Sequence, residues 1–449
     1  MGSVTKCFLL LVCAAAFWAW PTTANAQVYP CSPNVPGCLD NVPFFYTILD
    51  GAPAHPDVQV VTCGTKISSC VAVAFQDQTA RSTDAVLLSE LRREILGQPT
   101  PTASSGFTFV FPRGSRILRK PNRSFGPTFS EPATTQPPRT LSVGFEYQYF
   151  TYGQIIGAQS PSASVTYFNG DTPLWRQDTT LTLRRHVVNT YAAFGLSNYV
   201  DVSVLVPVVA TQLSGTLKYG WVGRAPHEQF QFSGSAASVG DISIAGKAVF
   251  GNVNSRFGVA GTLYIPSGNE EKLSGIDITR GRITAIWSGL GERRVQPHLN
   301  VAFTTPLEKR ETVDGVDPNV GYDVHQQPFD LYPKQLDVVP GVDVVAGSRL
   351  TLTVDVLARR TINSAHVEFS RKRPELVTGV LLDGRVRCCL NSEEVYYPAV
   401  GDITNGQVAV GGKWNVATDT LLNVNFLVPF GRYTVRPNIS INLGTTIQF

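Results

Sequence analysis

The chain has 449 residues, of which 43% are hydrophobic and 16% are charged, and its formal net charge at pH 7 is +3. Soluble domains carry about 25% charged residues, so this chain is poor in charge. The small net charge, without a basic run interleaved with aromatic residues, argues against nucleic acid as a partner. The 39 glycines, 24 phenylalanines and 15 tyrosines are instead typical of a protein built from strands.

Residues 1–26 predict a secretory signal peptide. An apolar run at 8–20 is followed by Ala24 and Ala26, the small residues that signal peptidase requires before a mature start near Gln27. The run is too short to cross ~30 Å of hydrocarbon as a helix. No later stretch offers 18 uninterrupted apolar residues, so we expect an exported chain without a transmembrane helix.

Residues 27–138 differ from the rest of the chain in being rich in proline and cysteine. They contain one helical pattern, with Ser82 or Thr83 as the N-cap and Gly97 as a stop signal. We expect this segment to join the first strand of a barrel at its periplasmic end. Two placements stay open: a plug inside the barrel, or a separate periplasmic domain.

Six cysteines remain once the signal peptide is removed, and in an oxidising periplasm they are disulfide candidates. Four lie early in the chain, in two pairs with six residues between the partners, which suggests local pairing among three possible connectivities. The other two are adjacent and could form a strained ring or bond elsewhere. A metal site there is a weaker alternative, because no histidine lies at ligand spacing. The candidates are Cys31, Cys38, Cys63, Cys70, Cys388 and Cys389.

Residues 139–449 contain twelve strand candidates, most of them near the 9–11 residues that a tilted spanning strand needs. The predicted fold is all-β: a transmembrane antiparallel up-and-down β-barrel of about 12 strands, preceded by an irregular segment with one short helix. The predicted strands are 141–149, 185–195, 199–209, 240–250, 257–266, 282–290, 294–304, 335–346, 349–360, 405–415, 419–429 and 437–449.

The connections between these strands alternate in length. Those after strands two, four, six, eight and ten are only a few residues long, whereas those after strands one, three, five, seven and nine run to roughly 15–45 residues. Short periplasmic turns alternating with long extracellular loops are typical of bacterial outer-membrane barrels. Four prolines, which favour strand ends and edges, follow outward-running strands and predict the extracellular rim. They are Pro207, Pro266, Pro306 and Pro429.

The last predicted strand has a strict period of two. Ile441, Leu443 and Ile447 form one face, and polar residues such as Asn442 form the other. In an outer-membrane barrel the apolar face contacts lipid and the polar face lines the lumen. We expect the aromatic end, Phe449, to act as the signal by which the barrel-assembly machinery recognises the chain in the bacterial outer membrane.

Assigning the apolar face of each strand to lipid leaves a mixed set of side chains inside. Aliphatic residues such as Leu205 and Val339 share the inner face with charged ones, whereas a water-filled porin lumen is more uniformly polar. Either a narrow passage for small, poorly soluble molecules or packing against a plug would explain this mixture. The charged lumen candidates are Glu146, Asp201, Asp241, Lys247, Arg282, His298, Asp337, Asp343, Asp355 and Lys413.

Three short motifs occur in the order found in one known group of proteins. Residues 198–203 (NYVDVS), 239–247 (VGDISIAGK) and 264–269 (YIPSGN) resemble the family named for the MetA pathway of phenol degradation. The resemblance covers roughly residues 140–449. It implies an outer-membrane barrel, distantly like the long-chain fatty-acid channels, that passes small hydrophobic or aromatic compounds. It supplies no binding residues to carry over.

The predicted function is therefore passive uptake of small hydrophobic or aromatic solutes, with no enzyme activity, cofactor or metal. An alternative is a surface scaffold that binds a partner through the long connections at 305–334 and 361–404. A hydrolase is a further alternative, in which His227 or His325 would act at the outer rim. No Gly-x-Ser-x-Gly or His-Glu-x-x-His motif supports catalysis.

Overall fold

The fold is known from a computed structural model, and the predicted signal peptide and most of the predicted helix lie outside its described residues. Described are residues 59–64, 93–94, 97–103, 124–155, 162–169, 172–221, 228–251, 255–289, 293–308, 313–314, 328–329, 332–371, 375–380, 386–417, 419–433 and 435–449. Arg93 and Glu94 are helical, and the amide of Gly97 donates to the Arg93 carbonyl at 2.7 Å. No helix among the described residues is long and apolar enough to cross a membrane.

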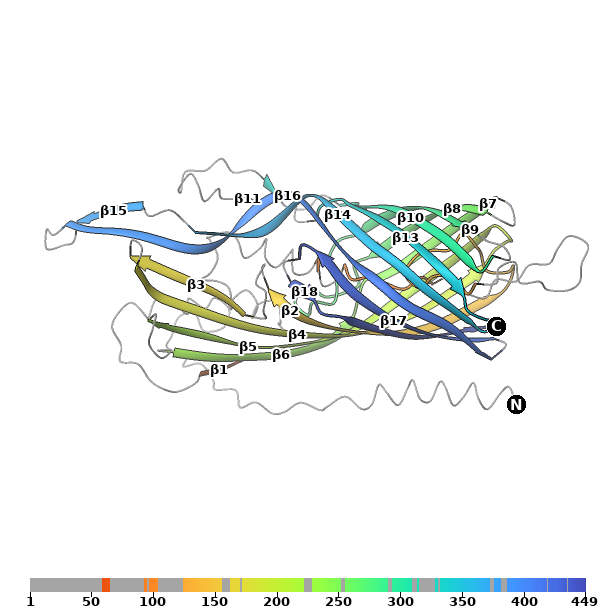
Figure 1. The fold of residues 1–449 in the computed structure, drawn as a ribbon, viewed down its shortest axis with the longest axis horizontal. Helices are drawn as coiled ribbons and strands as arrows, with labels where there is room; N and C mark the ends of the chain where they lie inside the picture. The colour runs from red at the N-terminus through yellow and green to blue at the C-terminus, as the bar shows by residue number, and fades with distance from the viewer. Residues whose placement is uncertain are drawn as a thin grey trace, which may run out of the picture. The chain divides into compact units, whose positions relative to one another are not determined.

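Twelve antiparallel strands close into a barrel, as the sequence predicts. Each strand pairs with the next in the chain, and the last pairs with the first, which leaves the barrel wall without a free edge (Figure 1). The barrel strands are β2 (Leu141–Ile155), β4 (Thr172–Gly195), β5 (Val200–Trp221), β7 (Ile242–Gly251), β8 (Ser255–Ile265), β9 (Arg280–Gly289), β10 (Val295–Pro306), β13 (Gln335–Val345), β14 (Leu350–Arg371), β16 (Val386–Ala417), β17 (Thr420–Gly431) and β19 (Ser440–Gln448).

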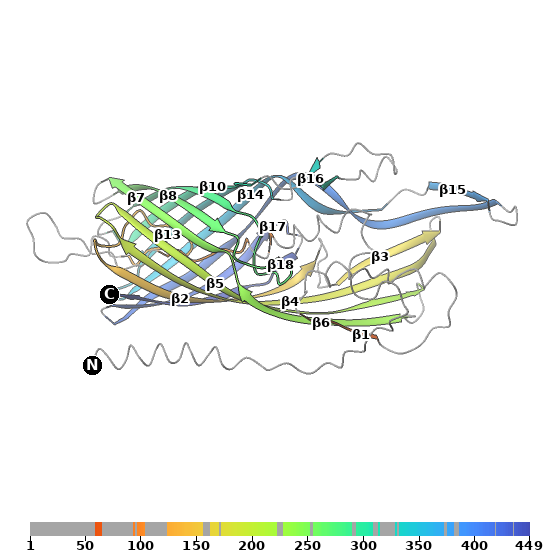
Figure 2. The same cartoon turned by 180° about the vertical axis from the view of Figure 1, so that it is seen from behind.

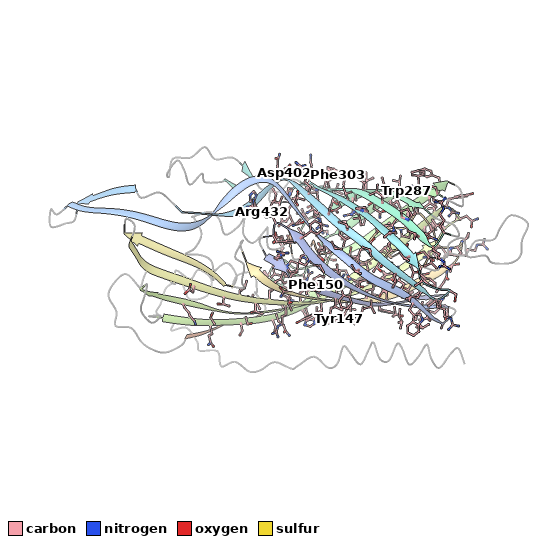
Figure 3. All side chains as sticks on the ribbon, viewed as in Figure 1. Tyr147, Phe150, Trp287, Phe303, Asp402 and Arg432 are labelled. Atoms are coloured by element: carbon pink, nitrogen blue, oxygen red, sulfur yellow. The ribbon has the colours of Figure 1, made fainter. Side chains whose placement is uncertain are left out.

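Burial alternates along each strand in the sense opposite to that of a soluble protein. In β17, Val424 and Phe426 are exposed on the outside, whereas Asn423 and Asn425 are buried inside. The aromatic side chain of Phe303 likewise projects from the outer wall (Figure 3). An apolar exterior on a closed barrel is suited to lipid, because exposing so much apolar surface to water is unfavourable. The barrel therefore lies in a bacterial outer membrane, as predicted.

The connections between β4 and β5 and between β13 and β14 are tight turns. The amides of Leu196 and Ala346 donate to the carbonyls of Val200 and Leu350, each at 3.0 Å. Figure 2 shows the antiparallel strands β7 and β8 side by side. The terminal residue is tied to the wall, because the amide of Phe449 donates to the carbonyl of Leu141 at 2.8 Å.

Four barrel strands are much longer than the sequence predicts. β4, β5, β14 and β16 have 24, 22, 22 and 32 residues. The prediction ended them at membrane-spanning length, but their pairing continues beyond it. The extension of β14 pairs with that of β16. β4, β5 and β16 also pair with strands in the long connections, namely β3 (Ser162–Asn169), β6 (Glu228–Val239) and β15 (Glu375–Val380). Three of the expected loops are thus partly strand.

The remaining short strands pair with this framework or with each other. β1 (Gln59–Gly64) runs parallel to β6, and β18 (Val435–Pro437) pairs with the outer end of β2. β11 (Val313–Asp314) pairs with β12 (Pro328–Phe329). Cys63 lies in β1, and Cys388 and Cys389 lie in strand β16 rather than in a loop. Cys31, Cys38 and Cys70 lie outside the described residues, so the disulfides stay a prediction.

Three of the four rim prolines stand at strand ends, and the fourth does not. Pro266 follows β8, Pro306 ends β10 and Pro429 is near the end of β17, whereas Pro207 lies inside β5. β5 pairs with β7 as far as Leu205 and with β6 from Val208 onward. Pro207 thus occupies the point where the neighbour of β5 changes, and its missing amide fits this interruption of the ladder.

β4 carries a polar side chain on its lipid side, in the second half of the strand. Arg185 is buried inside the barrel, so its neighbour His186 faces outward. The hydroxyl of Tyr147 hydrogen-bonds Nδ1 of His186 at 2.8 Å, and the ring of Tyr149 lies 4.9 Å from the imidazole ring. The two tyrosines thus give the His186 imidazole a hydrogen bond and a ring contact on a strand face that is otherwise apolar.

Candidate functional site

Charged side chains are concentrated in the barrel lumen. Of the ten charged residues that the sequence assigns there, eight are buried on the inner side of the wall, and Arg282 and Asp241 are half-buried, the latter in the turn before β7. The eight are Glu146, Asp201, Lys247, His298, Asp337, Asp343, Asp355 and Lys413. A buried charge is costly without a partner, so the contacts of these groups define how the lumen is organised.

Glu146 is held by asparagines from the closing strands. Its two carboxylate oxygens accept hydrogen bonds from Asn423 at 2.8 Å and Asn442 at 2.7 Å. Asn425 donates to the carbonyl oxygen of Asn442 at 3.2 Å, which extends the network across β17 and β19. These amides, predicted to face inward together with Glu146, join the first and last strands of the barrel.

A second cluster surrounds His298. Its Nε2 lies 2.5 Å from Oδ1 of Asp355, and its Nδ1 lies 3.9 Å from Oδ1 of Asp343. Asp343 also accepts a hydrogen bond from the hydroxyl of Ser124 at 2.9 Å. The cluster therefore links β10, β13 and β14 to the chain segment that precedes the barrel.

Residues 124–137 of that preceding segment lie inside the lumen and contact the wall on several sides. Lys413 of β16 donates to the carbonyl of Pro127 at 2.6 Å, and Ser288 of β9 accepts from the amide of Ala133 at 3.0 Å. Phe125 packs against Leu421 of β17. Wall strands on different sides of the barrel are thus bridged by one short stretch of chain.

Lys247 of β7 forms an ion pair with the segment. Its ammonium group lies 3.2 Å from Glu131 and 3.6 Å from Asp201 of β5, and it donates to the carbonyl of Pro132 at 3.4 Å. Lys247 and Asp201 are both nearly fully buried, whereas Glu131 is partly exposed. One cation therefore lies between a carboxylate of the wall and a carboxylate of the segment.

Residues 97–103 form a second piece of chain inside the lumen. The amide of Thr102 donates to the carbonyl of Thr128 at 2.8 Å, which joins the two pieces. Gln148 of β2 donates to the carbonyl of Pro99 at 2.9 Å, and Ala103 packs against Leu205. The two pieces together fill part of the lumen cross-section.

Three arginines and two aspartates line the wall nearer the extracellular end. Asp337 accepts hydrogen bonds from both Arg282 and Arg359, the latter at 2.7 Å. Arg280 lies 3.3 Å from Asp241 and stacks over the ring of Tyr264, 4.8 Å from its centre.

Asp241 is the half-buried carboxylate that organises this end of the barrel. It also accepts hydrogen bonds from the amides of Gly268 and Ile276 in the connection between β8 and β9. Burial raises the pKa of the Asp241 carboxyl, against the opposing effect of these hydrogen bonds and of Arg280. The carboxylate thereby fixes the connection over the mouth of the barrel.

A cavity of about 220 Å³ lies between these arginines and residues 97–103. Its wall includes aliphatic and aromatic side chains, among them Leu205, Val339 and Phe129, as well as the charged groups described above. Engineered cavities of about 150 Å³ hold a benzene molecule. The cavity is therefore large enough for a small single-ring solute.

Several residues around this cavity escape the sequence prediction. Arg359 lies two residues after Leu357 and four after Asp355 in β14, so the alternation of the strand places all three side chains on the inner face. The sequence pattern could therefore have identified Arg359 as a lumen residue. Arg280 precedes the predicted start of its strand, and Glu131 lies in an irregular segment without any period. Alternation identifies wall residues but gives no information on the chain inside.

Among the described residues, no group of three or more His, Cys, Asp and Glu side chains could hold a metal ion. His227 and His325, the candidates for a catalytic rim, lie outside the described residues. His366 is buried, and its Nδ1 lies 2.9 Å from the carbonyl of Ser364.

No protein-family model matches the chain, and no curated protein matches its sequence. Among solved structures, an outer-membrane channel from Pseudomonas putida F1 is similar over 71% of this chain and 100% of its own, at 11% identity and a TM-score of 0.40. The P. putida toluene transporter TodX is similar over 71% and 92%, at 10% identity and a TM-score of 0.30. A Pseudomonas aeruginosa FadL homologue is similar over 70% of this chain and 89% of its own, at 8% identity and a TM-score of 0.28. At these scores, the description of the barrel rests on its own strand pairing.

Proposed function

We propose that the chain is an outer-membrane channel for passive uptake of small hydrophobic or aromatic compounds. The observation that carries this proposal is the cavity of about 220 Å³ inside a closed lipid-facing barrel, with apolar and polar groups in its wall. Uptake without a cofactor or catalytic step is consistent with that geometry. Membership of the family named for the MetA pathway stays part of the proposal.

We further propose that residues 27–138 restrict the lumen as a plug. The contacts of residues 97–103 and 124–137 with the wall support this role over a separate periplasmic domain. A solute could pass only if part of this chain moves, because the contacts of Lys413 and Lys247 bridge the lumen. Passage would then be slow and selective rather than porin-like.

The test of the channel makes the same change, alanine to phenylalanine, on each of the two faces of β7. Ala245 lines the cavity, whereas Ala248 is exposed on the lipid side of β7. Cells that carry the protein should take up labelled benzyl alcohol faster than cells without it. Ala245→Phe should reduce this uptake because the ring fills the cavity, whereas Ala248→Phe should not. Equal uptake with and without the protein would refute the channel.

A surface scaffold is the second candidate, and the strands that continue past the lipid layer favour it. β16 alone has 32 residues, about three times the length of a spanning strand. A scaffold requires no open lumen, so it would leave solute uptake unaffected by Ala245→Phe. Cell-surface capture of a defined partner that is lost on shortening β14 and β16 would support it.

Assembly of the barrel is expected to depend on its last residue. Phe449 is bonded to Leu141 through its backbone, and its side chain is exposed. Deleting Phe449 should lower the fraction of folded barrel in the outer membrane, measured by heat-dependent mobility in electrophoresis. Unchanged insertion would remove its role as the signal for the assembly machinery.

A further inference from the structure

We infer that the lumen cavity binds a small amphipathic monoanion, a carboxylate carried on an aromatic or short aliphatic frame. This inference rests on the proposed function and narrows its solute class. The carboxylate would lie at the arginine end of the cavity, against Arg280, Arg282 and Thr304. Its apolar frame would lie against Val339 and Leu357.

The first observation is an excess of positive charge at that end. Arg282 and Arg359 both bond the same carboxylate, Asp337, so two cations share one anion. Arg280 is balanced by Asp241 at 3.3 Å. One positive charge is therefore left over where the cavity faces β9, β13 and β14.

The remaining charged groups around the cavity place the opposite charge elsewhere. Arg93 and Glu94 also line it, and their opposite charges add no net charge. On the far side of β8, Lys247 lies beside two carboxylates, Asp201 and Glu131, which leaves one negative charge there. The cavity is thus polarised, and an anion is attracted to the arginine end only.

The second observation is a set of buried polar atoms without partners among the described residues. Nε of Arg280 and Oγ1 of Thr304 have no hydrogen-bond partner, and both residues line the cavity. Both atoms can donate a hydrogen bond, and Thr304 is only 5% exposed. Buried polar groups are nearly always bonded, so these atoms indicate a ligand that supplies the missing partner.

The geometry of these atoms favours a carboxylate. Thr304 pairs with Arg282 across the β9–β10 ladder, and Pro306 pairs with Arg280, so Thr304 and Arg280 are diagonal neighbours on the inner face. A guanidinium can only donate and a hydroxyl can donate, whereas a carboxylate only accepts. A neutral alcohol could satisfy one of these donors, but it would leave the excess charge unbalanced.

The test compares benzoate with benzyl alcohol, which share the ring and differ in charge. Equilibrium dialysis of the full-length protein in detergent should show benzoate binding several times tighter than benzyl alcohol. Arg282→Gln removes the excess charge and leaves Arg359 paired with Asp337, so it should weaken benzoate binding roughly fivefold. Asp337→Asn should strengthen it by a similar factor, and Thr304→Val should weaken it without any change of charge. Benzyl alcohol carries no charge, so Arg282→Gln and Asp337→Asn should change its binding less than they change that of benzoate.

Equal affinity for the two ligands, or unchanged benzoate affinity in folded Arg282→Gln, would overturn the inference. If Asp337→Asn fails to fold, Arg282→Gln and Thr304→Val still decide the matter. The outcome is separable from that of the channel, which is tested by uptake into cells. Benzoate binding without uptake of benzyl alcohol would refute the channel and support the anion site. Uptake of benzyl alcohol that Ala245→Phe reduces, without benzoate binding, would support the channel and refute the anion site.

Discussion

Replacing Lys247 with methionine removes a buried cation that lies between two carboxylates, Glu131 of the inner segment and Asp201 of the wall. Methionine fills a similar volume, so the change isolates the charge and its hydrogen bonds. We expect residues 124–137 to leave the wall more often in this variant. Transient openings of the lumen should then become more frequent in single-channel recordings.

The magnitude follows from the contacts that are lost. Breaking a buried ion pair by removing one partner costs about 3–5 kcal/mol. Glu131 is 29% exposed on its side chain, and the solvent screens part of its interaction, so the lower value applies here. A change of about 3 kcal/mol corresponds to roughly a hundredfold increase in the undocked fraction of the segment.

The assay needs a partner variant and a control. Glu131→Gln removes the other side of the contact, so the double variant with Lys247→Met should open little more than Lys247→Met alone. Arg360→Met is the control, because Arg360 pairs with Asp402 at the exposed surface, away from the lumen. Additive effects of Lys247→Met and Glu131→Gln, or opening by Arg360→Met as large as by Lys247→Met, would refute the reasoning.

Two further predictions concern the stability of the wall, measured by urea titration of the folded barrel in lipid. A Cβ at Gly144 would lie 2.1 Å from the ring of Tyr191, so Gly144→Ala should destabilise the barrel by about 1–3 kcal/mol. Gly246→Ala is the control and should destabilise it less, because nothing lies within 4 Å of a Cβ there. Equal losses of stability in the two variants would contradict the packing around Gly144. Val424→Arg places a charge on the lipid face and should cost about 2–4 kcal/mol, whereas the same change at Ile439 near the rim should cost about 0–1 kcal/mol. Equal costs at Val424 and Ile439 would contradict the placement of the membrane.

The wall of the barrel was predictable because each strand is exposed to two different solvents. Val424 and Asn425 are neighbours in sequence, yet one faces lipid and the other the lumen, and this period of two survives in the sequence alone. The same logic placed Glu146 and Asp355 inside. It failed at the outer ends of β4 and β16, since pairing beyond the lipid does not require an apolar face.

The chain inside the lumen was not predictable in the same way. Lys413 bonds the carbonyl of Pro127 across 286 residues of sequence, and Ser124 bonds Asp343 across 219. Such contacts depend on which wall positions the irregular segment reaches, and an irregular segment has no period. Nothing in the sequence therefore predicts that Glu131 lies in the lumen, although both Glu131 and Asp201 form ion pairs with Lys247.

The conductance of the protein in a planar bilayer, with and without residues 27–138, tests the central claim most directly. Both forms would first be shown to be folded by their heat-dependent mobility. A restricted channel predicts small or rare openings for the full chain and larger, steady conductance for the shortened one. Equal conductance of the two folded forms would contradict the claim that this segment restricts the lumen.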